Sequence, residues 1–265
     1  MARIVVAATA PFGADVLERL ARTNDIALLL TRPDKPRGRG RTLQPTAAKQ
    51  VAERLGIPVA QPARLDETVD IPADTVVVTA YGLLVPESLL ERALWLNVHP
   101  SLLPHWRGAA PVERALMAGD DRTGVTIHRT TKELDAGPIA AQEAFALAPD
   151  DDAGAVYARA AELAARLIDD VLPEPRFTPQ PEEDVTYAEK IGPEDRILDL
   201  DDPAEEVANR VRALSPHIGA RAVVDGRPLV VWRARAAADG SLELLEVQPE
   251  GGRRMPYDAY LRGLR

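Results

Sequence analysis

The sequence predicts an α/β fold with a mostly parallel sheet, followed by a small β-rich domain. Apolar runs rich in β-branched residues are typical of strands buried on both faces. Segments with apolar residues at helical spacing lie between them, and this alternation favours a parallel sheet with helices on both sides. Strand-like runs around an Asp-Gly turn dominate the C-terminal part. The expected strands of the sheet are 3–10, 25–30, 74–80 and 94–98.

The spacing of apolar residues predicts the helices and strands that lie between and after these four strands. Apolar residues at helical spacing predict a helix from Phe12 to Leu20 and another over 45–55. Two further strand-like runs, 123–131 and 137–147, flank a polar loop. A continuous apolar stripe then predicts a core-packing helix over 153–172.

A segment rich in Pro and acidic residues, 173–184, predicts a semi-rigid linker and a domain boundary. We therefore expect a first domain over 1–172, a linker over 173–195 and a C-terminal domain over 196–265. In that last part, Asp202 and Pro203 indicate the start of a helix, with Asp202 as its N-cap. The dipeptide Asp225–Gly226 predicts a hairpin turn, and 242–247 a final strand.

Composition limits the classes of function. The chain has 265 residues, of which 46% are hydrophobic and 28% charged, as in a globular protein with a real core. The net charge of −9 opposes binding to nucleic acid or anionic membranes unless basic residues are concentrated locally. The absence of Cys excludes disulfides and thiolate chemistry. No signal-peptide pattern and no membrane-length apolar run is present, so we expect a cytoplasmic protein, a monomer with no membrane partner.

The strongest chemical signal is the pair Asn97 and His99 at the end of the strand over 94–98. Ligands bind beyond the carboxyl ends of parallel strands, and residues two apart in a strand point to the same side. An Asn amide can stabilise a developing oxyanion, and a His can move a proton near neutral pH. The pair thus suggests acyl-type transfer through a tetrahedral intermediate. Alternatively, Asn97 caps a turn and His99 is a satisfied polar residue.

Motifs in a consistent order identify a family resemblance. The segments "NVHPSLLPHWRGAAPVERAL" and "TGVTIHRTTKELDAGPI" resemble the central signature of the folate-dependent formyltransferases, and "TRPDKPRGRGRTLQP", "VVVTAYGLLVP" and "VTYAEKI" continue the similarity. The form "SLLP-x-WRGAAP" most resembles the members that act on methionyl-tRNA. The resemblance implies a Rossmann-like formyltransferase domain followed by a shortened, barrel-like C-terminal domain of the tRNA-binding type.

The resemblance also implies the site. Asn97, His99 and Asp135 correspond to a catalytic trio, although Asp135 taken alone is equally plausible as a turn residue. The implied cosubstrate is 10-formyltetrahydrofolate, the implied acceptor is initiator methionyl-tRNA, and no metal is required. Pro100 and Pro104 restrict the backbone of the loop beside the pair. Residues expected to line the cosubstrate pocket are Tyr81, Gly82, Leu83, Leu84, Val85, Ser101, Leu102, Leu103, Pro104, Leu134 and Gly137.

A basic segment in an acidic protein gives a second expected site. A solvated charged loop is one interpretation, but arginines interleaved with Gly favour phosphate contacts. The segment resembles the family's insertion loop that binds the tRNA acceptor arm. Pro33 and Pro36 exclude a central strand, so a mobile loop is expected. The residues expected to bind tRNA are Arg32, Lys35, Arg37, Arg39 and Arg41.

The sequence departs from the family pattern in three places. The part after the linker is short, "AATAPFG" lacks the family's usual Gly-Thr-Pro order, and Pro100 replaces a usual Gly. These departures leave two alternatives open. One is a formyltransferase acting on an amino-sugar nucleotide, and the other is a non-catalytic relative that binds tRNA or folate. His105, His128 and His217 are expected to be ordinary loop, strand and turn residues.

Overall fold

The structure is a computed structural model that describes residues 1–37 and 42–264. It divides into two compact units, each assembled from separate stretches of the chain. These units do not follow the boundaries expected near 172 and 195, so that division stays a prediction. One unit comprises Met1–Arg107, Gly124–Ala144 and Ala158–Thr186, and the other comprises Gly108–Thr123, Phe145–Tyr157 and Tyr187–Arg265.

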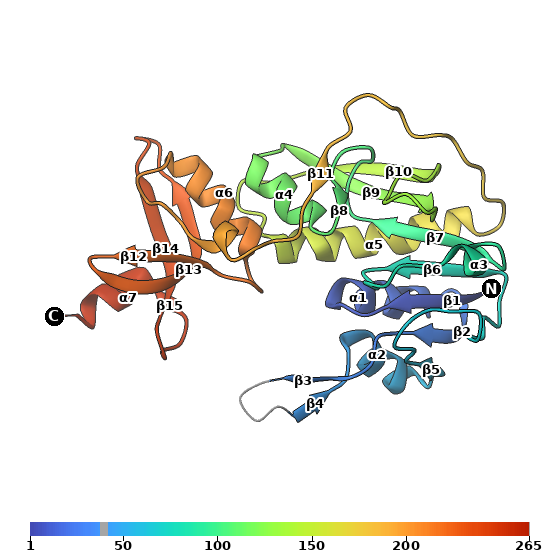
Figure 1. The fold of residues 1–265 in the computed structure, drawn as a ribbon. Helices are drawn as coiled ribbons and strands as arrows, with labels where there is room; N and C mark the ends of the chain where they lie inside the picture. The colour runs from blue at the N-terminus through green and yellow to red at the C-terminus, as the bar shows by residue number, and fades with distance from the viewer. Residues whose placement is uncertain (38–41, 265) are drawn as a thin grey trace. The chain divides into compact units, whose positions relative to one another are not determined.

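A seven-stranded sheet forms the centre of the first unit, in the order β5-β2-β1-β6-β7-β9-β10 (Figure 1). Strands β1, β2, β5, β6 and β7 run parallel, whereas β9 pairs antiparallel with β7. The expected mostly parallel sheet is therefore confirmed. The strand order reverses between β1 and β6, where open α/β sheets bind ligands. The strands are β1 (Arg3–Ala8), β2 (Asp25–Leu30), β5 (Val59–Ala60), β6 (Thr75–Thr79), β7 (Leu94–His99), β9 (Arg122–Arg129) and β10 (Ile139–Ala146).

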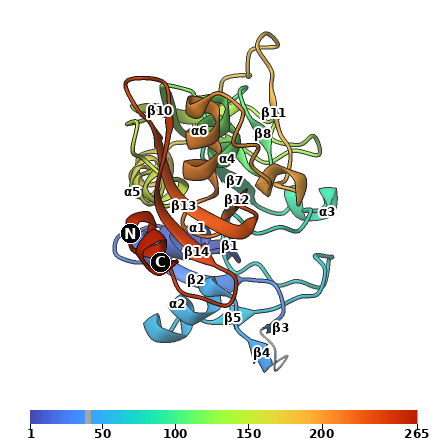
Figure 2. The ribbon, with the colours of Figure 1, turned by 90° about the vertical axis from the view of Figure 1, so that its left-hand side faces the viewer.

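Helices cover both faces of this sheet. Figure 2 shows α1, α2 and α5 on one face and α3 on the other. Helix α2 begins where the Thr46 side chain accepts a hydrogen bond from the Lys49 amide, and it ends at Gly56 in the left-handed region, φ 69°. Buried apolar side chains of the strands fill the interior between these layers. The helices are α1 (Pro11–Leu20), α2 (Ala47–Leu55), α3 (Glu87–Leu90) and α5 (Ala153–Val171).

The basic segment forms a two-stranded ribbon at its base. Strands β3 (Lys35–Arg37) and β4 (Thr42–Gln44) pair antiparallel, with Lys35 opposite Gln44. The expectation of a loop without strands is therefore corrected for the described part, because Pro36 is tolerated in an edge ribbon where no ladder donor is needed. Arg39 and Arg41 lie outside the described residues.

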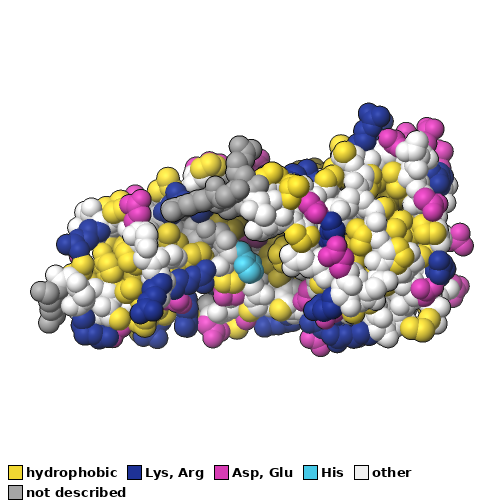
Figure 3. Space-filling view, turned by 90° about the horizontal axis from the view of Figure 1, so that it is seen from below, with side chains coloured by type: hydrophobic (Ala, Val, Ile, Leu, Met, Phe, Trp, Pro, Cys, Tyr) yellow, Lys and Arg dark blue, Asp and Glu magenta, His cyan; other side chains and the backbone are white. Residues whose placement is uncertain are grey.

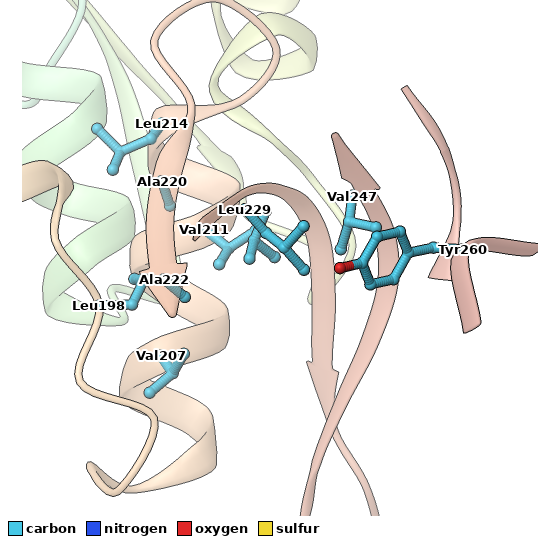
Figure 4. Packing of buried hydrophobic residues seen from close by; sticks show 10 residues of the cluster. Leu198, Val207, Val211, Leu214, Ala220, Ala222, Leu229, Val247 and Tyr260 are labelled. Atoms are coloured by element: carbon cyan, nitrogen blue, oxygen red, sulfur yellow. The ribbon is translucent and has the colours of Figure 1, made fainter. Parts of the chain in front are cut away.

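The second unit has an antiparallel sheet in the order β12-β13-β14-β15. Figure 4 shows apolar side chains of α6 and the sheet packed together, with Tyr260 of α7 beside Val247. The small β-rich C-terminal domain is therefore confirmed. The elements of this part are β8 (Arg107–Gly108), α4 (Pro111–Ala118), β11 (Tyr187–Ala188), a 3-10 helix η1 (Glu194–Arg196), α6 (Ala204–Leu214), β12 (Ala220–Val224), β13 (Arg227–Ala236), β14 (Leu242–Pro249), β15 (Met255–Pro256) and α7 (Tyr257–Arg262).

Local features of the second unit test two expectations. Asp225 and Gly226 both have positive φ, 48° and 73°, and join β12 to β13 as the hairpin prediction required. The N-cap expected at Asp202 was wrong by one residue, because the helix begins at Ala204 and Pro203, with φ −50° and ψ 130°, occupies the cap position. Across residues 1–37 and 42–264, no helix is both long and apolar enough to cross a bilayer.

The turn between β9 and β10 depends on a close backbone approach at Gly137. A Cβ atom at Gly137 would collide with the carbonyl oxygen of Arg129 and come within 3.1 Å of Thr131 Cγ2. The ends of the turn are joined there by the Arg129 amide, which donates to the Pro138 carbonyl at 2.9 Å. Only Gly fits this position without moving the turn.

We therefore predict that Gly137→Ala destabilises the protein by about 1–3 kcal/mol, the usual cost of overpacking. Thermal unfolding should show a lower midpoint, by roughly 2–4 °C for each kcal/mol. The matched control is Gly263→Ala, because a Cβ atom there would lie 3.4 Å from its nearest neighbour. An unchanged midpoint for Gly137→Ala would contradict the close approach.

Candidate active site

The candidate site lies at the carboxyl end of β7. Asn97 and His99 are two apart in this strand and point to the same side, as the sequence predicted. Strand β9 runs antiparallel beside β7 and places His128 directly opposite Asn97. The turn after β9 then brings Asp135 to the same place. The three residues of the expected trio are therefore brought together in the structure.

The carboxylate of Asp135 lies at the centre of this group, with its side chain only 10% exposed. Its Oδ1 accepts a hydrogen bond from Asn97 Nδ2 at 3.1 Å. Its Oδ2 lies 3.7 Å from His99 Nδ1, and its Oδ1 lies 3.7 Å from His128 Nε2. One carboxylate thus faces an amide and two imidazoles, which is an arrangement suited to proton transfer beside a polar donor.

His99 is held in one tautomer by a backbone carbonyl. Its Nε2 lies 2.8 Å from the carbonyl oxygen of Trp106, and because a carbonyl only accepts, Nε2 carries the hydrogen. The side chain is buried, and burial lowers the pKa of His99 below its usual value, although the charge of Asp135 acts in the opposite direction. The neutral ring therefore presents an unprotonated Nδ1 toward Asp135.

The loop after β7 is stiffened by a network of hydrogen bonds. Thr126 Oγ1 donates to the Ser101 carbonyl at 2.7 Å and accepts from the Leu103 amide at 3.1 Å. Gln142 Nε2 donates to the Leu103 carbonyl at 2.9 Å. At the end of the loop, Trp106 has a positive φ of 61°, a conformation uncommon for a non-glycine residue. These contacts hold the Trp106 carbonyl in place against His99.

The expected linker also contributes to the site. Gln180 Nε2 donates to the carbonyl oxygens of Asp135 and Gly137, each at 2.8 Å. Its Oε1 accepts from the guanidinium of Arg107 at 2.7 Å. Asp135 has a positive φ of 47°, and Gln180 fixes the backbone on both sides of its neighbour Ala136. The linker is therefore more than a spacer, and Gln180 is a residue that sequence reasoning missed.

In the segment over 81–85, which follows β6, buried or half-buried residues alternate with exposed ones. Tyr81 is buried, and Leu83 and Val85 pack against the same core cluster, whereas Gly82 and Leu84 are exposed. Burial raises the pKa of Tyr81 to about 12. Since the end of β6 pairs with β7 at Val78 and Asn97, this segment starts beside the site. Leu84 is 88% exposed, which is unusual for a large apolar side chain.

The other residues expected around the cosubstrate differ in accessibility. Ser101, Leu103, Pro104 and Gly137 are buried, and Leu102 is half-buried. Leu134, which precedes Asp135, is 62% exposed. Direct contact with a ligand is therefore open mainly to Gly82, Leu84 and Leu134, while the buried residues shape the backbone behind them.

The expected tRNA-binding residues are only partly described. Lys35 is exposed on β3, and Arg32 lies at the base of the ribbon, where its Nη1 would be 3.7 Å from a Cβ atom at Gly82. The side chain of Arg37, like all of Arg39 and Arg41, is outside the description. Lys49 Nζ anchors the base of the ribbon by donating to Asp34 Oδ2 at 2.7 Å. Figure 3 shows one face of the molecule, on which basic and acidic side chains are interspersed.

His128 is the second residue that sequence reasoning missed. It was expected to be an ordinary strand residue, and it does lie in β9, but its Nε2 is 3.1 Å from Asn97 Nδ2. The signal that would have found it is the antiparallel register of β9 on β7. Within the described parts of the chain, no group of three or more His, Cys, Asp or Glu side chains is arranged to hold a metal ion.

Comparison with known proteins identifies relatives with similar sequences and folds. A methionyl-tRNA formyltransferase from Dechloromonas aromatica (strain RCB) is 37% identical over 294 residues, covering 98% of this chain and 95% of the relative. Among solved structures, methionyl-tRNA formyltransferase from Clostridium thermocellum has a TM-score of 0.66 at 15% identity, with 94% of this chain and 99% of that chain covered. An N-formyltransferase from Helicobacter canadensis, in complex with folinic acid and dTDP-3-aminofucose, has a TM-score of 0.68 at 15% identity, with 89% and 88% covered.

Two family models match the chain. The formyl transferase model matches residues 2–172, and the model of the formyl transferase C-terminal domain matches residues 190–239. The first match spans the central sheet and the candidate site, and the second spans the start of the C-terminal sheet. The chain belongs to the formyl transferase family.

Proposed function

We propose that this protein transfers the formyl group of 10-formyltetrahydrofolate to the amino group of initiator methionyl-tRNA. The observation that carries this proposal is the convergence of Asn97, His99 and Asp135 at the carboxyl end of β7. The relative that covers nearly the whole chain is named for this reaction, which supports the same choice. A cytoplasmic location and a monomeric state stay predictions.

In the proposed reaction, the neutral amine of methionine attacks the formyl carbon. A C–N bond forms, the formyl oxygen becomes an oxyanion, and Asn97 Nδ2–H stabilises it. The bond from the formyl carbon to the folate nitrogen then breaks. The proton lost by the amine reaches that nitrogen with the help of His99, and Asp135 stabilises the charged ring in between. Burial lowers the pKa of His99, which favours the neutral ring before the reaction.

The cosubstrate site is proposed along the exposed apolar residues beside the trio. Leu84 and Leu134 expose large apolar surfaces, and Gly82, between Leu84 and the end of β6, is exposed as well. A flat, partly apolar pterin would cover such a surface and remove it from water. The buried loop over 101–104 would act as the rear wall, because its backbone is fixed by Thr126 and Gln142.

The trio alone does not select the acceptor, because its chemistry serves any primary amine. An amino-sugar nucleotide is the second candidate, supported by the fold shared with the Helicobacter enzyme. The basic segment from Arg32 to Arg41 favours the longer polyanion. Supplying 10-formyltetrahydrofolate with methionyl-tRNA or with an amino-sugar nucleotide tests the choice. Formylation of the sugar alone would overturn the proposal.

The roles of the trio lead to a mutational prediction. Asn97→Ala and His99→Ala should each lower turnover of methionyl-tRNA by about 10² or more, because each removes a group that acts on the reacting atoms. Thermal unfolding should show that both variants fold. His105→Ala is the matched control, since His105 is an exposed histidine of the same loop. Near-normal turnover in either variant would remove that residue from the mechanism.

The basic segment leads to a prediction about salt. Changing Arg37, Arg39 and Arg41 together to Ala should weaken methionyl-tRNA use and flatten its salt dependence by roughly one unit of slope per lost phosphate contact. Arginine suits these contacts because its planar fork can donate two hydrogen bonds to a phosphate. The measurement is KM for methionyl-tRNA over a range of salt concentrations.

A second triple variant controls for the change in net charge. Arg22, Arg64 and Arg176 are exposed arginines outside the basic segment, so their replacement by Ala removes the same charge elsewhere. That variant should keep the salt response of the natural protein. If the two triple variants behave alike, the segment is only a solvated connection, and the sugar-nucleotide acceptor becomes the better proposal.

A further inference from the structure

A second imidazole lies inside the site and has no role in the proposed reaction. The side chain of His128 is 2% exposed, and its Nε2 lies 3.1 Å from Asn97 Nδ2. Its ring and that of His99 are 6.3 Å apart between centroids and nearly perpendicular. A buried polar side chain needs partners, and one partner of His128 is Asn97, whose orientation the proposed reaction requires.

The tautomer of His128 follows from its other nitrogen. Nδ1 lies 3.1 Å from the carbonyl oxygen of Arg129, and because a carbonyl only accepts, Nδ1 carries the hydrogen. In the neutral ring, Nε2 then has a lone pair and accepts from Asn97 Nδ2. This is the reverse of His99, whose hydrogen is on Nε2. The two histidines of the site are therefore held in opposite tautomers by two backbone carbonyls.

The two partners of Asn97 determine which end of its amide faces inward. Asp135 Oδ1 and His128 Nε2 both accept, each at 3.1 Å from Asn97 Nδ2. A reversed amide would place its oxygen against a carboxylate and against a nitrogen lone pair, which is repulsive on both sides. The nitrogen is therefore fixed toward these partners, with one N–H for each of them.

We propose that His128, as the Nδ1–H tautomer, is a positioning residue that keeps the Asn97 amide nitrogen turned toward the reacting group by accepting one of its two N–H bonds. The inference rests on the proposed role of Asn97. When the formyl oxygen becomes negative, it replaces one of the two acceptors without any rotation of the amide. The neutral acceptor, His128, forms the weaker of the two bonds, so it is the one that yields.

A set of variants at one buried position tests this role. His128→Leu removes the acceptor and keeps an apolar side chain of similar size, whereas His128→Gln keeps an acceptor near the position of Nε2. We expect His128→Leu to lower kcat about tenfold, because the Asn97 amide then also adopts orientations in which its nitrogen faces away from the formyl group, with KM for both substrates little changed. His128→Gln should restore most of kcat. If His128 only stabilised the fold, then His128→Leu and His128→Gln with equal unfolding midpoints would also have equal kcat.

The dependence on Asn97 is tested by a double variant. In an Asn97→Ala background, His128→Leu should cause no further loss, because the group that it positions is gone. An additional tenfold loss there would overturn the proposal, and so would equal kcat for His128→Leu and the natural protein. The proposed transfer to methionyl-tRNA would stand in both of these cases.

A measurement without substrate separates this inference from the proposed function. Nitrogen-15 NMR of the labelled natural protein near neutral pH should show His128 protonated on Nδ1 and unprotonated on Nε2. His128→Leu should also speed the exchange of one side-chain amide hydrogen of Asn97, whose signals are identified by their loss in Asn97→Ala. A His128 ring protonated on Nε2 would overturn the inference even if the enzyme formylates methionyl-tRNA as proposed.

Discussion

The site depends on one carboxylate that is largely withdrawn from water, that of Asp135. A charge withdrawn from water must be compensated by hydrogen bonds or opposite charges, and the Asn97 amide donates one such hydrogen bond to Asp135. Its two oxygens face Asn97 on one side and His99 on the other. In the proposed reaction, the same carboxylate would therefore orient the oxyanion donor and stabilise the charged imidazole. The chemistry proposed for this protein is therefore a consequence of where this carboxylate is held.

Holding that carboxylate requires backbone from distant parts of the sequence. The antiparallel pairing of β9 with β7 starts the turn beside Asn97. Gly137 then allows the turn to close against the Arg129 carbonyl. Gln180, from the segment expected to be a linker, then fixes the carbonyls of Asp135 and Gly137. Asp135 keeps its unusual positive φ because these contacts hold the backbone around it.

The sequence was sufficient for the parts that local patterns determine. Apolar runs predicted the main parallel strands, and the dipeptide Asp225–Gly226 predicted the hairpin between β12 and β13. The same-side placement of Asn97 and His99 followed from alternation within one strand. His128 and Gln180 could not be found this way, because their contacts depend on pairing between strands and on the path of an irregular segment. Neither register nor path has a local signature, since both are determined by tertiary packing.

The most direct test of the central role of Asp135 is the titration of His99, followed by NMR, in the natural protein and in Asp135→Asn. Burial lowers the pKa of His99 and the negative charge of Asp135 raises it. Removing that charge while keeping the shape of the side chain disfavours the imidazolium. The pKa of His99 should therefore lie below its usual value in the natural protein and fall further in Asp135→Asn. An unchanged or higher pKa in the variant would contradict the account.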